Sequence, residues 1–82
     1  MSKECKGTVA QVQGPVIDVQ FPQGELPSIQ DALWLEAGGQ RRVMEVAQHV
    51  GRDTVRCFML SPSEGIGRGM EVRSMGGPIS VP

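Results

Sequence analysis

The sequence predicts an all-β fold: a small six-stranded antiparallel barrel that is closed or nearly closed. Glycine and proline make up 11 and 6 of the 82 residues, and the longest stretch free of both runs only from Gln40 to Val50. Interior glycine and proline cost a helix about 1 and about 3 kcal/mol respectively, so long helices are excluded. Between these breaks, apolar and polar residues alternate with a period of two, which is typical of strands.

Six segments have this alternation, and each ends at turn residues. The predicted strands are residues 7–12, 16–21, 32–37, 41–50, 54–59 and 70–75. Gly14-Pro15 and Gly38-Gly39 supply turns, Gly51-Arg52-Asp53 supplies a tight hairpin, and Gly76-Gly77-Pro78 ends the last strand. The residues predicted to share single strand faces are Ile17, Val19 and Phe21, and then Val55, Cys57 and Met59. So few strands hide their edges most simply by closing into a barrel.

One segment could instead form a helix. Ser28 could cap it, with Asp31 three residues later, and Pro27 and Gly38 bound it at about ten residues. That length is marginal for a helix. We therefore expect a turn from Ser28 to Asp31, followed by a strand.

The charge balance argues against nucleic acid as a partner. There are 8 Lys+Arg against 9 Asp+Glu, a formal net charge of -1, whereas phosphate binding needs a concentrated cationic surface. Arg41-Arg42, the only adjacent basic pair, is interpreted as a solvated strand end. Only Phe21, Trp34 and Phe58 are aromatic, too few for a base-stacking platform. No apolar run approaches the ~20 residues that span a bilayer.

The glycine-dense stretch SPSEGIGRGMEV, Ser61 to Val72, suggests a phosphate-binding loop at first sight. A Walker loop needs Lys followed by Ser or Thr, and a dinucleotide loop needs a following helix; neither pattern is present. We interpret Gly65, Gly67 and Gly69 as residues with positive φ or close strand approach, with Arg68 on the surface.

The remaining candidates for chemistry are few. His49 and Cys57 could meet across the hairpin, but one His and two Cys cannot complete a zinc site. We interpret His49 as a hydrogen-bonded strand-end residue, Cys57 as a core thiol and Cys5 as a loose thiol in a polar tail. Neither Asp18 nor Glu25 has a second acid placed near it. The methionines at 44, 59, 70 and 75 and Trp34 are interpreted as core or interface filler. No catalytic, cofactor-binding or metal-binding residue is assigned.

Several phrases resemble one known family. GPVIDVQFPQGELPSIQDAL, MEVAQHVGRDTVRC, SEGIGRGMEV and GGPISVP together resemble the N-terminal domain of the beta subunit of F-type ATP synthases. The resemblance covers Gly7 to Pro82. Its most specific parts, Gly24–Pro27 and Glu45–Gly51, favour the beta subunit over the alpha subunit and over vacuolar-type or flagellar-export relatives. The chain departs from the family's pattern at Gly67 and at Ser74-Met75-Gly76, which leaves the loop conformation and the branch of the family open.

The resemblance implies a six-stranded barrel at residues 7–82 after a flexible tail at 1–6. It implies that barrels of alternating alpha and beta subunits join into a crown, so the expected partners are alpha-subunit barrels on either side. The parent would make or hydrolyse ATP coupled to ion transport, as a peripheral complex on the cytoplasmic side of an energy-transducing membrane. Its ATP or ADP and Mg²⁺ would bind in the following domain, and this chain ends before it.

Two alternatives of other classes stay open. One is a stand-alone barrel that binds nucleic acid, because small barrels often bind oligonucleotides. The other is a free-standing nucleotide-binding protein. Both find little support in the charge and in the glycine spacing.

Overall fold

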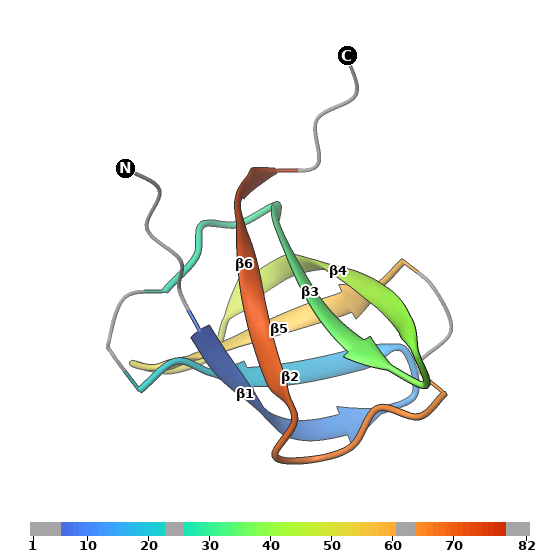
Figure 1. Ribbon diagram of the computed structural model, residues 1–82. Helices are drawn as coiled ribbons and strands as arrows, with labels where there is room; N and C mark the ends of the chain where they lie inside the picture. Colours follow the sequence, from blue (N-terminus) through green and yellow to red (C-terminus); the bar gives the residue numbers. More distant parts are fainter. Residues whose placement is uncertain (1–5, 23–25, 61–63, 79–82) are drawn as a thin grey trace.

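The computed structural model describes residues 6–22, 26–60 and 64–78, with only the backbone of 75–78. Its six strands are β1 (Lys6–Gln13), β2 (Val16–Gln20), β3 (Asp31–Ala37), β4 (Gln40–His49), β5 (Thr54–Met59) and β6 (Glu71–Pro78). The described residues contain no helix, and the predicted all-β fold is confirmed (Figure 1).

The strands form a closed barrel in the order β1-β2-β5-β4-β3-β6, and every neighbouring pair is antiparallel. β6 closes the barrel because it pairs with β1 on one side, where Val72 is opposite Gly7, and with β3 on the other, where Arg73 is opposite Trp34. Figure 1 shows β6 running between β1 and β3. A closed ladder removes the free edges that six short strands would otherwise expose.

The inward face of the barrel is filled with apolar side chains. The core consists of Val9, Ile17, Val19, Phe21, Leu33, Leu35, Ala37, Met44, Val46, Val55, Cys57 and Val72. Among the described residues, no polar or charged residue falls in the buried class. The predicted faces are confirmed, except that Met59 is only partly buried and packs against the core cluster. Each large side chain buried in this way contributes about 1.5–3 kcal/mol.

The segment before β3 adopts the expected turn rather than a helix. The amide of Asp31 donates to the carbonyl of Ser28 at 3.0 Å, and the Asp31 carboxylate accepts from the Ser28 amide at 2.9 Å. Gln30 has a φ of 76°, and its amide donates to the carbonyl of Val46 at 2.8 Å. That carbonyl lies at the β-bulge between Val46 and Gln48, where β4 bends.

The hairpin between β4 and β5 is tied to the end of β2. Its Asp53 carboxylate accepts hydrogen bonds from the Gln20 side chain at 3.0 Å and from the Thr54 hydroxyl at 3.1 Å, and these bonds lower the pKa of Asp53. The Asp53 carbonyl accepts a hydrogen bond from the amide of Phe21. Phe21, although it lies just beyond β2, is thereby held in the core.

Two predicted boundaries are wrong. Gly76-Gly77-Pro78 was predicted to end the last strand, but β6 continues through it and pairs Pro78 with Asp31. A proline is tolerated there because it is the last residue of the strand. Lys6 was assigned to the tail, but it is the first residue of β1 and pairs with Arg73 of β6. The rest of the predicted tail, with Cys5, lies outside the described residues.

Gly7 is required where β1 approaches β2 and the Phe21 ring closely, and this predicts a destabilising substitution. A Cβ atom at this position would lie 2.8 Å from Cγ1 of Val19 and 2.9 Å from the carbonyl oxygen of Gln20. Overpacking of this kind costs about 1–3 kcal/mol. We expect Gly7→Ala to lower the free energy of unfolding by about 2 kcal/mol, measured by urea denaturation.

Gly67→Ala is the matched control for this prediction. A Cβ atom at Gly67 would have nothing within 4 Å, and the backbone there does not have a positive φ. We expect this change to stay within about 0.5 kcal/mol. Equal effects of the two substitutions would contradict the close approach at Gly7.

Candidate functional site

The glycine loop is a structural connection to β1. Gly65 and Gly69 have φ values of 83° and 89°, as predicted, whereas Gly67 does not have a positive φ. The Gly69 amide donates to the carbonyl of Val9 at 2.8 Å, and the Gly67 amide donates to the sulfur of Met70 at 3.1 Å. These two amides are thus directed at acceptors within the chain. Arg68 is exposed, as predicted.

His49 and Cys57 do not form a site together. Cys57 is opposite Val46 in the ladder and fully buried, and burial, aided by the negative charge of Asp18, raises the pKa of its thiol to about 12. His49 is exposed at the end of β4, where its Nε2 donates to the carbonyl of Pro27 at 2.7 Å. The core thiol and the hydrogen-bonded strand-end histidine are both confirmed.

The acids predicted to stand alone have different outcomes. Asp18 forms an ion pair with Arg56, its cross-strand neighbour, at 3.1 Å, and this carboxylate raises the pKa of Arg56. Glu25 lies outside the described residues. Within the described ranges, no group of three or more potential metal ligands comes together. The assignment of no catalytic or cofactor residue stays a prediction.

Trp34 was interpreted as core or interface filler, and it is not in the core, because it lies on the outer face of β3. Its half-buried ring lies between two cations, with the Arg41 guanidinium 4.2 Å and the Arg73 guanidinium 5.8 Å from its centroid. Such contacts are worth about 0.5–1 kcal/mol at exposed sites. Arg42 was interpreted as solvated, yet it is opposite Leu35, and its Nε is buried without a hydrogen-bond partner in the described part of the chain.

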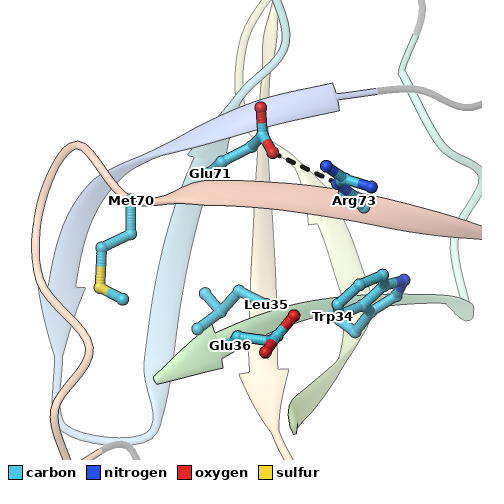
Figure 2. A pocket seen from close by; sticks show the side chains of 6 residues that line it. All are labelled: Trp34, Leu35, Glu36, Met70, Glu71 and Arg73. Carbon is cyan, nitrogen blue, oxygen red and sulfur yellow. Dashed lines mark hydrogen bonds and ion pairs between the residues drawn. The ribbon is translucent and has the colours of Figure 1, made fainter. Parts of the chain in front are cut away.

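A groove opens on the outer surface where β3 and β6 separate. Their ladder stops at the pair Trp34–Arg73 and does not extend toward the β3–β4 turn. The space beyond has a volume of about 320 Å³, and it is lined by Trp34, Leu35, Glu36, Met70, Glu71 and Arg73. Figure 2 shows Leu35 and Met70 extending into this space and Glu71 joined to Arg73 by an ion pair of 3.2 Å. We call this region the β3–β6 groove.

A second surface feature is centred on β5. Phe58 and Leu60 are 48% and 55% exposed. On the neighbouring strands, Val16 is opposite Phe58, and the Val43 carbonyl accepts a hydrogen bond from the Leu60 amide at 3.0 Å. We call these four residues the apolar patch.

The groove and the patch lie on opposite sides of the barrel. In the closed order, β5 and β6 are three strands apart in either direction, and in Figure 1 they cross on opposite walls. Sequence reasoning did not find either feature. The alternation of β5 does place Phe58 outside, and that signal could have found the patch. Nothing in the sequence indicates where the β3–β6 ladder stops.

These observations define a class: a closed six-stranded barrel domain with an apolar interior and two unlike surface features. Residues 9–76 match the family model described as the ATP synthase alpha/beta family, beta-barrel domain. The match spans most of the chain, which therefore belongs to the ATP synthase alpha/beta family. Subunits of this family work beside partner subunits in a complex. Among the described residues, no helix is long and apolar enough to span a membrane.

The raised pKa of Cys57 predicts a loss of stability at high pH. The unfolded thiol ionises near its ordinary value of 9.0, whereas the folded thiol ionises near 12. The contribution of the protonated Cys57 thiol to the free energy of unfolding is therefore fully present below pH 9 and is lost as the pH rises toward 12. We expect the free energy of unfolding, relative to Cys57→Val, to fall by up to about 1.4 kcal/mol per pH unit above pH 9.

Urea denaturation from pH 7 to 10.5 measures this difference, with Cys5→Ser in both proteins so that only one thiol titrates. Valine is the control because it fills the same apolar site and does not ionise. A difference between the two proteins that is constant from pH 8 to 10.5 would show that the Cys57 thiol is not protected from ionisation.

Proposed function

We propose that this barrel is the N-terminal assembly domain of the catalytic beta subunit of a rotary F-type ATP synthase. In this role it joins the barrels of two alpha subunits, one on either side, in the crown of an alternating ring. The parent subunit makes or hydrolyses ATP coupled to ion transport. The complex is peripheral, on the cytoplasmic side of an energy-transducing membrane, and the barrel itself does not insert.

The observation that carries this proposal is the presence of two unlike surface features on opposite sides of the barrel. A subunit in a closed ring meets its neighbours through two different surfaces, because head-to-tail contacts are heterologous. The apolar patch on β5 and the charged β3–β6 groove supply two such surfaces. A subunit that formed only a two-fold dimer would need one self-complementary surface instead.

The choice of the beta subunit rests on two sequence segments. Gly24–Pro27 and Glu45–Gly51 resemble the beta subunit more closely than the alpha subunit or the vacuolar-type and flagellar-export relatives. The family match supports the domain and does not separate these branches. By the same resemblance, the nucleotide and Mg²⁺ belong to the domain that follows the barrel in the parent.

Replacement of Phe58 by glutamate in the full-length subunit tests the proposal. The side chain is 48% exposed, so the barrel should fold, but a charge would be buried at the contact with the neighbour. We expect native mass spectrometry with the alpha partner to show a loss of intact rings of about tenfold or more, given the 1–3 kcal/mol cost of burying an unpaired polar group.

Gln11→Glu is the control, because Gln11 is exposed on β1, between the two proposed contact sides. It adds the same charge and should leave ring assembly unchanged. Circular dichroism checks that both variants keep the all-β fold. Normal assembly by a folded Phe58→Glu subunit would exclude the apolar patch as a contact and with it the proposed arrangement.

A further inference from the structure

The β3–β6 groove exists because two paired strands separate before they end. Leu35 and Glu36 on β3, Glu71 at the start of β6 and Met70 just before it lie beyond the last residue pair of the β3–β6 ladder. Continuation of the observed β3–β6 register would place Glu36 opposite Glu71. Like charges directly opposite each other are destabilising in a sheet. The groove thus begins where the β3–β6 ladder stops, next to the Glu36 and Glu71 carboxylates.

The side chains that line the groove carry a net negative charge, and the Arg41 guanidinium lies just outside this lining, over Trp34. The lining contains two carboxylates and one guanidinium, which gives a formal charge of -1. Glu71 is paired with Arg73 at 3.2 Å. Glu36 is opposite Arg41 in the β3–β4 ladder, but the Arg41 guanidinium lies 4.2 Å over the Trp34 ring instead. In the described part of the chain, Glu36 is left without a hydrogen bond or an ion pair.

The floor of the groove is apolar. Leu35 belongs to the core and is 1% exposed, whereas Met70 is partly buried and packs against the core; Figure 2 shows both side chains between β3 and β6. An occupant that fits both the apolar floor and the negative charge of the lining has an apolar stem and a positive end. Lysine and arginine side chains have this character, because they bury their methylene stems and keep the charge at the surface.

We propose that the β3–β6 groove receives a lysine or arginine side chain of the neighbouring subunit. Its stem packs on the partly buried Met70, and its charged end pairs with the Glu36 carboxylate. This inference rests on the proposed function, because it assigns the chemistry of one of the two contacts. A bare divalent cation fits less well, because Ca²⁺ and Mg²⁺ take six or more oxygen ligands and the lining offers one unpaired carboxylate.

A peptide titration tests the chemistry of the groove directly. Trp34 is the only tryptophan of the chain and lines the groove, so its fluorescence reports occupancy. The probes are the blocked tripeptides Gly-Arg-Gly and Gly-Lys-Gly, with the uncharged Gly-citrulline-Gly as reference. We expect a saturable change with both basic probes, weaker at high salt, and binding to the citrulline peptide that is weaker by about threefold or more.

Glu36→Gln should weaken binding of the basic probes by about threefold or more, because one exposed ion pair is lost. Glu64→Gln makes the same change of charge at an exposed residue outside the lining and should leave binding unchanged. Equal binding of the arginine and citrulline peptides, or equal behaviour of the two variants, would overturn the proposal. Sedimentation that shows a self-associating chain disrupted by Glu36→Gln would also overturn it, since a second copy would then fill the groove.

The full-length subunit separates this inference from the proposed function. If Phe58→Glu prevents ring assembly and Glu36→Gln weakens it relative to Glu64→Gln, both stand. If Phe58→Glu prevents assembly and Glu36→Gln has no effect, the ring role stands and the groove inference fails. If neither variant changes the rings, the proposed function fails, and peptide binding alone would not restore it.

Discussion

The whole structure depends on β6, the strand that closes the barrel. It is the last strand in the sequence, yet it pairs with β1 and with β3, and without it both of those strands would have free edges. On the β1 side the ladder of β6 continues to Glu71, which pairs with Thr8, whereas on the β3 side it stops at the pair Trp34–Arg73. The same strand, β6, therefore completes the barrel around the core and leaves the groove beside β3.

Because the interior is apolar, the polar and charged side chains of the described residues lie at the surface of the domain. Because no polar or charged residue among those described falls in the buried class, ion pairs and cation–π contacts are all on the outside. Single contacts of this kind are weak. In a subunit whose other domains also meet the neighbour, linkage through one chain makes the barrel contact effectively intramolecular, so a weak contact is sufficient to contribute to assembly. The proposed ring role is consistent with such a surface.

Much of the fold could be predicted because it depends on local pattern. Alternation predicted six strands and their buried faces, and the Ser28–Asp31 turn was predicted from residues that bond to each other. The extension of β6 to Pro78 was missed because pairing with Asp31 overrides the turn propensity of Gly76-Gly77. The surroundings of Trp34 could not be predicted either. They depend on register, which brings Arg41 and Arg73 from two different strands to one indole ring.

Hydroxyl-radical footprinting of the assembled complex tests the central claim, that the barrel meets neighbours on two opposite sides. The two sides carry readily oxidised side chains: Phe58 in the apolar patch, and Trp34 and Met70 in the β3–β6 groove. The account predicts that oxidation at both sides falls when the free subunit enters the complex, while His49 at the end of β4 keeps its reactivity. Unchanged oxidation of Phe58, or of Trp34 together with Met70, would show that at least one side stays open, in contradiction of a barrel held between two neighbours.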